Sequence, residues 1–470
     1  MNQLMQGTIP LTARLEPWMQ RLVADRTECQ ELIRQHGSPV NIHEFSALAR
    51  NADELRTVAF GHGIDFRVYL ARKANKTIGA IDAAVAADCG VDVASLHELK
   101  QVLERGVAPE QIIVTAAVKS RELLALALEH AVVVSMDNHD EAETLLEIAG
   151  ALGVRAKVAL RLASAHPSIP ATRFGLRADR WLTFLEGVEQ SSRLDIAGIH
   201  FHLNGYSAEQ RSRLLLESVA LTDALVVLGY QPSFIDMGGG IPMSYLEHAE
   251  EWEAFWAALA QQQAGSEEIT WKSDALGSLD GAPSGTVYPY YQKLIRGPWL
   301  DAVLSARPDG APSSIADMLV KRKLQLRCEP GRSLLDGCGM TLASVAFAKE
   351  RSDGIPLLGL HMNRTQCRST SADFLLDPIL IHAADPPRKR EPFSGFLVGA
   401  YCIEEELLLR RRFDFPFGAA PQDLVVFPNT AGYLMHIVES ASHQLPLAVN
   451  VVRAGGGWKR DEIHEQALPA

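Results

Sequence analysis

The segment Tyr69-Leu70-Ala71-Arg72-Lys73-Ala74-Asn75 ends a run of apolar residues with a lysine. The run itself, residues 66–70, has the apolar and aromatic composition of a buried β-strand. An ammonium group is costly to bury, so apolar surroundings would lower the pKa of Lys73 toward the neutral amine. A neutral amine at a strand end is what a Schiff base with an aldehyde cofactor requires. For this segment alone, the alternative is a hydrated surface lysine that caps the strand.

The composition bounds the class of protein. At 470 residues the chain is too long for one ordinary core and suits two or three domains. The net charge of −12 argues against nucleic acid and anionic membranes as partners, and no apolar run is long enough to span a membrane. The N-terminus lacks the layout of a signal peptide, and the six cysteines show no C-x-x-C spacing. We therefore expect a cytoplasmic protein without a disulfide framework or a metal site.

Short apolar runs alternate with stretches of helical period in residues 43–329. The strand candidates are Phe66–Leu70, Val91–Val93, Ile112–Thr115, Val132–Ser135, Lys157–Leu162, Leu194–Leu203, Ser233–Met237 and Leu324–Cys328. Helical period lies between them, for example at 94–105, 121–130, 140–152 and 208–228. Eight strands that alternate with helices fit a (β/α)8 barrel better than an open sheet. The predicted fold class is therefore α/β, a TIM barrel with a β-rich second domain.

The β-rich domain is predicted from short β-like runs after Arg332. These runs are Met340–Ala348, Leu357–His361, Ile379–His382, Phe396–Val398, Leu424–Phe427 and Ala448–Val452. We expect residues 1–42, with one amphipathic helix at 11–36 and a short strand at 39–42, to join this domain. The predicted division is 1–42, a barrel at 43–329 and a C-terminal β-domain at 330–470.

An insertion is expected within the barrel at about 261–316. This stretch is rich in Gly, Ser and Pro and is longer than one βα unit needs. Its aromatic anchor is predicted to be Tyr288, Tyr290 and Tyr291. Long loops of this kind often form lids or contact surfaces, and a plain structural excursion is the open alternative.

Polar residues stand at the C-terminal ends of the predicted barrel strands, the face that carries the active site in such barrels. In chain order they are Lys73, Asp92, Arg161, His202, Gly238, Gly239, Gly240, Glu329, Gly331 and Arg332. Each has a plain structural explanation when taken singly, such as a tight turn for the glycines. Their shared position predicts one site.

The chemistry of these residues suits a planar, anionic cofactor. The triple glycine at 238–240 lets backbone N–H groups approach a phosphate closely, and Gly331-Arg332 adds a further N–H and a guanidinium. His202 offers a flat ring that can stack on a planar cofactor. Glu329 ends an apolar strand and needs a cationic partner there. A pyridinium nitrogen would be such a partner, and the pair would keep the ring protonated as an electron sink.

These motifs resemble those of the fold type III, alanine racemase-like group of pyridoxal phosphate enzymes, and are most similar to its ornithine/diaminopimelate decarboxylase branch. The resemblance runs from about Pro39 to about Leu445. The matching segments are Tyr69–Asn75, Gly90–Leu99, Ala159–Leu162, Thr172–Gly175, Gly198–His202, Asp236–Gly240 and Glu329–Arg332. The resemblance implies pyridoxal 5'-phosphate as the cofactor, with Lys73 as the Schiff-base lysine, His202 stacked on the ring, and Asp92 and Arg161 in the cofactor site.

Two segments of the β-domain extend the resemblance. Gly399-Ala400-Tyr401-Cys402 resembles the family's G-P-x-C, and Ala431-Gly432-Tyr433 resembles its G-A-Y. The resemblance implies that Tyr433 contacts the cofactor phosphate. It also implies that Cys402 comes from a second subunit and helps to protonate the decarboxylated carbanion, so that the protein is an obligate homodimer with shared active sites. The alternative for Cys402 is an inert buried thiol.

The chain departs from the family pattern where phosphate and substrate are bound. Gly205 replaces a phosphate-binding serine, and Ile403 replaces an acidic residue, although Glu404 follows it. Asp377 stands where the diaminopimelate branch has an arginine that grips a distal carboxylate. Because this exchange reverses the charge presented to the substrate, we hypothesise a cationic substrate end, read by Asp377 and Glu404. The alternative is that Asp377 only caps a turn.

The sequence thus predicts a pyridoxal phosphate-dependent decarboxylase of a basic or diamino acid, such as lysine, ornithine, arginine or a diaminopimelate-like substrate. Lys73, Glu329 and Cys402 are its expected catalytic residues. One alternative is an amino acid racemase of the same superfamily, which usually places an arginine at the ring nitrogen and a tyrosine as second base. The other is a catalytically silent, cofactor-binding paralogue that acts as a regulatory partner, for which Ile403 and Gly205 leave room.

Overall fold

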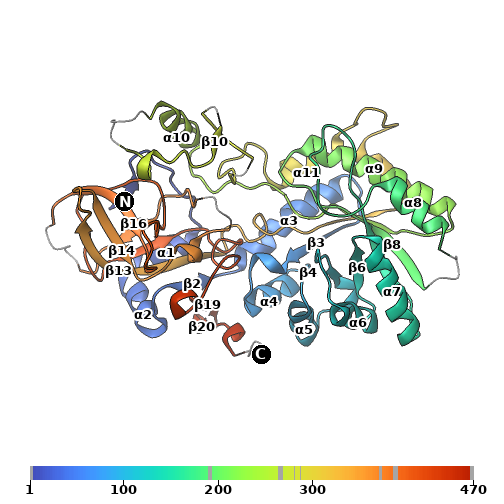
Figure 1. The fold of residues 1–470 in the computed structure, drawn as a ribbon, viewed down its shortest axis with the longest axis horizontal. Helices are drawn as coiled ribbons and strands as arrows, with labels where there is room; N and C mark the ends of the chain where they lie inside the picture. The colour runs from blue at the N-terminus through green and yellow to red at the C-terminus, as the bar shows by residue number, and fades with distance from the viewer. Residues whose placement is uncertain are drawn as a thin grey trace.

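The computed structural model describes residues 4–188, 193–262, 268–279, 281–285, 287–369, 373–384 and 390–465. Figure 1 shows two bodies side by side along the long axis, a barrel ringed by helices on the right and a β-rich body on the left. The chain starts in the β-rich body, crosses into the barrel at Ser46, where the first helix of the ring begins, and returns after β12.

Eight parallel strands close into a barrel in the order β12-β3-β4-β5-β6-β7-β8-β9. Their bounds are β3 Phe66–Ala71, β4 Gly90–Val93, β5 Ile112–Val114, β6 Val133–Met136, β7 Ala156–Arg161, β8 Leu194–His200, β9 Phe234–Asp236 and β12 Gln325–Cys328. Each falls on a strand candidate from the sequence. Strands buried on both faces give near-continuous apolar runs, which is why the runs were visible. The prediction of a (β/α)8 barrel is confirmed.

Helices surround the barrel. They are α3 Ser46–Gly61, α4 Ile78–Ala86, α5 Leu96–Glu104, α6 Arg121–Glu129, α7 His139–Leu152, α8 Ala178–Glu186, α9 Ala208–Val227, α11 Arg296–Ser305 and α12 Ile315–Arg322. Several begin at a side chain that accepts a hydrogen bond from the backbone N–H three residues on, namely Ser95, Ser120, Asn138, Ser207 and Ser314. Such caps satisfy an N–H that the helix leaves unpaired. No helix within the described ranges is long and apolar enough to cross a membrane.

The barrel interior is filled by side chains, so it is a packed core rather than a pore. Tyr69, Ile113, Val133, Ala159, Ala197 and Phe234 form this inner cluster. Two glycines make room for its rings. A Cβ at Gly90 would lie 2.4 Å from the Tyr69 ring, and one at Gly198 would lie 2.6 Å from the Phe234 ring. The packed interior leaves the strand ends as the place where polar side chains meet.

The β-rich body is a ten-stranded mixed sheet. Its strands are β1 Gln6–Gly7, β2 Val40–His43, β13 Gly339–Glu350, β14 Pro356–Leu360, β15 Ile379–Ile381, β16 Phe393–Val398, β17 Phe413–Phe415, β18 Leu424–Phe427, β19 Val449–Ala454 and β20 Gly457–Arg460. The N-terminal strand β2 pairs with β13 on one side and with β19 on the other. The prediction of a β-rich second domain is therefore confirmed as a fold, with strands at each β-like run of the sequence.

The prediction of a single helix at 11–36 is wrong. The structure has two helices, α1 Pro17–Ala24 and α2 Arg26–His36. Asp25 lies between them with a non-helical backbone, and its side chain accepts a hydrogen bond from the N–H of Glu28. An aspartate that caps the next helix competes with helix continuation, although the apolar period runs through it.

The stretch 243–291, which overlaps the insertion expected at 261–316, packs mainly against the β-rich body. Its helix α10 (Ala249–Gln261) and the short pair β10 (Ser278–Leu279) and β11 (Ala282–Pro283) lie at the top of Figure 1, over that body. Trp252, Phe255 and Tyr290 belong to the same buried cluster as Phe374 and Phe413. By contrast, α11 packs on α3 and α9 of the barrel ring. We therefore interpret the added segment as residues 243–291, whereas the expected bounds of 261–316 stay a prediction.

Candidate active site

Lys73 lies in the short turn Arg72–Ala74 (η1) at the end of β3. Its Nζ is 2.5 Å from Oδ2 of Asp92 on β4. The other oxygen of Asp92 accepts a hydrogen bond from the hydroxyl of Thr115, which follows β5. About 35% of the Lys73 side chain is exposed, whereas the Asp92 side chain is fully buried. The amine is therefore oriented by a buried carboxylate, while part of the Lys73 side chain stays exposed.

The charge state of Lys73 differs from the one expected. Burial lowers its pKa, but the negative charges of Asp92 and Glu329 raise it by more, so the net pKa shift is upward. Lys73 is thus an ammonium in the cofactor-free chain, and the expectation of a neutral amine is wrong for this state. The two carboxylates come from the strands on either side of β3, namely β4 and β12, so they meet Lys73 only in the folded barrel.

Arg161 at the end of β7 extends this network. Its Nη1 donates to the carbonyl of Thr115 and to Oδ1 of Asp137, each at 3.3 Å. The guanidinium lies 4.2 Å from the centre of the Phe174 ring. Burial lowers the pKa of Arg161, but an arginine remains charged. Thr115 and Asp137 were not predicted, since each is a common residue at a strand end.

The triple glycine follows β9 and forms a tight cradle. Gly238 and Gly240 have positive φ angles of 65° and 76°, which favour glycine. A Cβ on Gly238, Gly239 or Gly240 would lie 2.5, 2.9 or 2.6 Å from its nearest neighbour atom. The N–H of Gly238 donates to Oδ1 of Asp236 at 2.9 Å. The conformation leaves no space for side chains here.

His202 lies against this cradle. A Cβ on Gly238 would be 3.2 Å from Nδ1 of His202. Burial, reinforced by the nearby Arg211, lowers the pKa of His202 to about 3. Its ring is therefore neutral at physiological pH. A flat, neutral imidazole is suited to stacking on an aromatic ring without repelling a cation.

Glu329 directly follows β12 and is 3% exposed. Its Oε1 has no hydrogen-bond partner within the part of the chain that the structure describes. Burial raises the pKa of Glu329 well above its ordinary value, and the negative charges of Asp92 and Asp236 raise it further. His200, the last residue of β8, brings its Nε2 to 3.5 Å from Oε1 of Glu329. His200 was missed by the sequence analysis, which singled out His202 two residues later.

The phosphate end of the expected site is built by both bodies. Arg332 donates to the carbonyl of Gly432 at 3.3 Å, and its guanidinium lies 5.2 Å from the centre of the Tyr433 ring. Tyr433 has a φ of 72°, and its N–H donates to the carbonyl of Ala74 at 2.7 Å. A Cβ on Gly331 would lie 2.7 Å from the Tyr433 ring. Gly331, Arg332 and Tyr433 are thus brought together beside the turn that carries Lys73.

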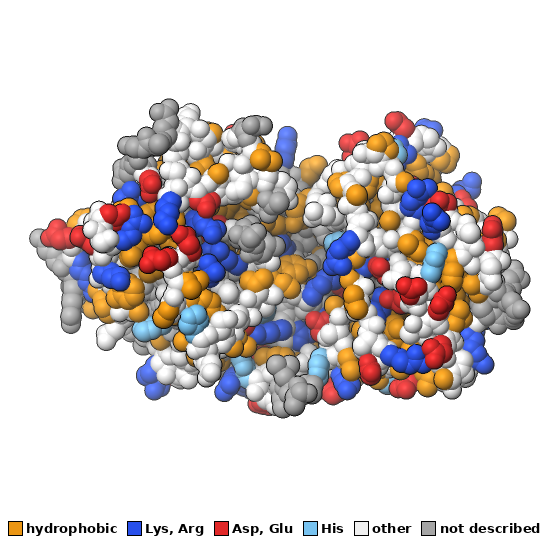
Figure 2. Space-filling model, in the orientation of Figure 1, with side chains coloured by type: hydrophobic (Ala, Val, Ile, Leu, Met, Phe, Trp, Pro, Cys, Tyr) orange, Lys and Arg blue, Asp and Glu red, His pale blue; other side chains and the backbone are white. Residues whose placement is uncertain are grey.

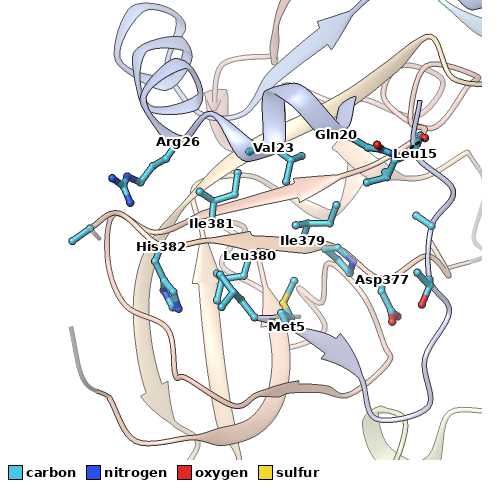
Figure 3. Close-up of a pocket in the computed structure, with 16 residues that line it drawn as sticks. Met5, Leu15, Gln20, Val23, Arg26, Asp377, Ile379, Leu380, Ile381 and His382 are labelled. Atoms are coloured by element: carbon cyan, nitrogen blue, oxygen red, sulfur yellow. Dashed lines mark hydrogen bonds between the residues drawn. The ribbon is translucent and has the colours of Figure 1, made fainter. Parts of the chain in front are cut away.

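Asp377 lies elsewhere. Its Oδ1 accepts a hydrogen bond from Arg411 at 2.7 Å, and its Oδ2 accepts one from the N–H of Leu11 at 3.1 Å. Figure 3 shows Asp377 at the edge of a cavity of about 530 Å³, which lies between α1 and β15 and is lined mainly by apolar side chains. The structure therefore engages this carboxylate with Arg411 and does not bring it to Lys73 within one chain.

Cys402 and Glu404 occupy the loop between β16 and β17, and both are exposed. Neither contacts the residues around Lys73 within the single chain described here. In Figure 2 the surface is hollowed where the two bodies meet, and acidic and basic side chains are interspersed over this face. The expectation that Cys402 and Glu404 reach a site on a second subunit stays a prediction.

Comparison with known proteins gives consistent matches. Residues 48–270 match the family model of the pyridoxal binding domain of pyridoxal-dependent decarboxylases. The uncharacterized protein y4yA of Sinorhizobium fredii is 29% identical over 415 residues, which cover 88% of this chain and 87% of that protein. A diaminopimelate decarboxylase of Zymomonas mobilis is 24% identical over 442 residues, 90% of each chain. The crystal structure of diaminopimelate decarboxylase from M. jannaschii with L-lysine matches with a TM-score of 0.69 at 18% identity over 94% of both chains.

Residues 48–270 thus match a pyridoxal binding domain, and the closed barrel with its rim has the architecture expected for the fold type III, alanine racemase-like group of pyridoxal phosphate enzymes. Together with the similarity to diaminopimelate decarboxylases, these findings support a divergent member of the ornithine/diaminopimelate decarboxylase branch. Its cofactor is pyridoxal phosphate.

The residues present fit this cofactor. The unpartnered, buried Oε1 of Glu329 provides an acceptor for a ring nitrogen that carries a proton. The glycine cradle admits no side chains, so an anion can approach the backbone closely there, as a phosphate group requires. Donor atoms of His200, Asp236 and Glu329 lie within 4.8 Å of one another. The expectation of a site without metal stays a prediction.

Proposed function

We propose that the chain removes the α-carboxylate of an amino acid. When bound, pyridoxal phosphate supplies an aldehyde carbon for an amine and a ring that accepts the electrons of the broken bond. The observation that carries the proposal is the pairing of Lys73 with Glu329 on one barrel rim: an accessible amine and a buried carboxylate acceptor whose charges influence each other.

Each residue has a proposed task. Lys73 would hold the cofactor through its aldehyde carbon, and Asp92 orients the Nζ of Lys73. Glu329 would accept a hydrogen bond from a protonated ring nitrogen, and His202 would lie against the ring. The glycine turn at 238–240, through the N–H groups of Gly239 and Gly240, would bind the phosphate together with Gly331, Arg332 and Tyr433. Cys402 of a second copy, or Lys73, returns a proton to Cα after the carboxylate has left.

The residue at the ring nitrogen favours decarboxylation over racemisation. A carboxylate there keeps the ring protonated and therefore a strong electron acceptor. An arginine at this position, the usual choice of the racemases, would weaken that property. The buried and unpartnered Oε1 of Glu329 supports the first arrangement.

The substrate is proposed to be a basic or diamino acid. The arginine expected to grip a distal carboxylate is absent at position 377. However, Asp377 forms an ion pair with Arg411, so it is a weak candidate for binding the distal charge of the substrate. The exposed Glu404, carried by a second copy of the chain beside Cys402, is the better candidate for a cationic substrate end.

The test is a screen of amino acids with purified chain and added pyridoxal phosphate. We expect CO2 release from at least one of lysine, ornithine, arginine and diaminopimelate, and none from Lys73→Ala. Optical rotation followed in parallel detects racemisation. The neighbouring Lys76, whose Nζ pairs with Glu439 at 2.5 Å, provides the control variant Lys76→Ala. Racemisation without CO2 would replace this function by the racemase, and turnover of no amino acid would favour the silent paralogue.

A further inference from the structure

His200 lies between two other buried residues, Ser135 and Glu329. Its Nδ1 lies 2.6 Å from the hydroxyl of Ser135 on β6. Its Nε2 lies 3.5 Å from Oε1 of Glu329. Neither Nε2 nor Oε1 has a hydrogen bond to any other described residue, and the His200 side chain is fully buried. Buried polar atoms without partners are rare, so this near contact calls for an explanation.

The tautomer of His200 follows from these contacts. Burial lowers the pKa of His200 well below its ordinary value, so the imidazole is neutral and carries one N–H. If Ser135 donates to Nδ1, the proton lies on Nε2 and points to Glu329. The reverse tautomer would turn a bare nitrogen toward Oε1, which is repulsive when Glu329 is ionised. The Ser135 hydroxyl can donate to Nδ1, so it permits the tautomer that donates to the carboxylate, and an ionised Glu329 selects that tautomer.

A neutral donor has a particular effect on Glu329. It stabilises the carboxylate by a hydrogen bond without cancelling its charge, and that charge is what holds a protonated ring nitrogen. The groups that face Glu329 and His200 from the surrounding elements are Asp92, Asp236, Lys73, Arg161, His202 and Lys119. The two aspartates oppose ionisation of Glu329, and the cations favour it. Donor atoms of His200, Asp236 and Glu329 lie within 4.8 Å of one another, so His200 is close to an aspartate that opposes this ionisation.

We propose that His200, oriented by Ser135, is a positioning residue that keeps Glu329 ionised and therefore keeps the proton on the ring nitrogen of the cofactor. The inference rests on the proposed function, since it takes Glu329 as the partner of that nitrogen. Without His200 the shared proton moves from the ring nitrogen to Glu329, and the ring becomes a poorer electron acceptor.

The experiment uses pyridoxal phosphate labelled with ¹⁵N in the ring and bound to the full chain. The ¹⁵N NMR signal separates a protonated from a bare ring nitrogen and does not depend on turnover. We expect a protonated signal in the wild type and in His200→Gln, which retains an N–H near the same place. In His200→Leu the signal moves to that of the bare nitrogen. Ser135→Ala, which perturbs packing least, is expected to shift it in the same direction by a smaller amount.

Two controls separate this role from general packing. His382 is another buried histidine, and it lies in the β-rich body. Its Nδ1 contacts Asp423, and its Nε2 has no partner among the described residues. His382→Leu should leave the ¹⁵N signal unchanged. A carbon analogue of the cofactor, with C–H in place of the ring nitrogen, should bind wild type and His200→Leu with dissociation constants within about twofold of each other.

The outcomes are distinct. A protonated ring signal retained in both His200→Leu and Ser135→Ala would overturn the proposal, even if the chain decarboxylates. Equal weakening of both cofactors in His200→Leu would assign His200 to packing alone. A wild-type chain that binds no pyridoxal phosphate would refute the proposed function and this inference together.

Discussion

Carboxylates that share a buried rim set the proton balance of the site. Burial raises the pKa of Asp236 to about 6, although the Gly238 N–H that donates to it opposes this shift. Its Oδ2 has no partner among the described residues. An unfolded aspartate is ionised above about pH 4, so folding takes up a proton between about pH 4 and 6. The stability contributed by Asp236 is therefore present below pH 4 and is lost as the pH rises through 6.

Asp236→Asn tests this balance. Asparagine keeps an oxygen for the Gly238 N–H and removes the ionisation. We expect the cofactor-free variant to be more stable than wild type by about 2 kcal/mol at pH 8, and equally stable near pH 4. Denaturant unfolding at the two pH values measures the difference. If the variant and the wild type differ in unfolding free energy by the same amount at both pH values, ionisation of Asp236 is not the cause.

Asp377 offers a second prediction at the residue scale. Its partner Arg411 is 1% exposed, so Asp377→Asn would leave a buried guanidinium without its counter-charge. We expect a loss of about 3 kcal/mol in unfolding free energy and an unchanged KM for basic substrates. Glu404→Gln should do the opposite, raising KM with little effect on stability. A rise in KM for Asp377→Asn, measured on folded protein, would restore Asp377 as a substrate residue.

At the scale of elements, the added segment 243–291 reaches the phosphate end of the site. The guanidinium of Arg332 lies 4.2 Å from the centre of the Tyr288 ring, and Tyr288 makes an edge contact with Tyr206 at 5.6 Å. A desolvated cation–π contact contributes about 1–2 kcal/mol. The segment therefore orients the arginine that we propose for the phosphate, a role closer to support than to a mobile lid.

Tyr288→Leu should accordingly weaken pyridoxal phosphate binding about tenfold, because Arg332 loses its aromatic neighbour. Tyr288→Phe retains the ring and should bind as wild type. The dissociation constants come from absorbance titration of the cofactor-free chain. Tyr291→Leu in the same segment is the control, since its ring makes no described contact with Arg332. Equal affinity in Tyr288→Leu and wild type would remove the segment from the phosphate site.

At the scale of the whole molecule, the exposed Cys402 is the residue that we propose to complete the active site of a second subunit. If Cys402 and Glu404 serve a second copy, Lys73→Ala and Cys402→Ala each spoil every site in their own homodimers. A mixed dimer then contains one site with both residues intact. We expect the mixed variants to regain about a quarter of wild-type decarboxylation after subunit exchange. No recovery, in a mixture shown to exchange subunits, would contradict shared sites.

Much of this architecture is encoded locally. The barrel strands were predictable because each is buried on both faces and stands out as an apolar run between helical stretches. The glycines at 238–240 and the pairing of Glu329 with Arg332 were visible as motifs. Helix boundaries were harder to predict where a local hydrogen bond interrupts an apolar period, as Asp25 does between α1 and α2.

The sequence by itself thus indicated the barrel strands and the rim positions, because each is marked by residues within one βα unit, and its motifs carried the resemblance that implies the cofactor. The tertiary structure alone decided the charge states and the interaction partners of the site residues and of Asp377. Asp92 and Glu329 make Lys73 an ammonium, Arg411 engages Asp377, and His200 meets Glu329 from a different strand. Even the start of α4 is capped by Asp461, 383 residues along the chain. Electrostatic and hydrogen-bond energies depend on distance in space, which no local pattern in the sequence records.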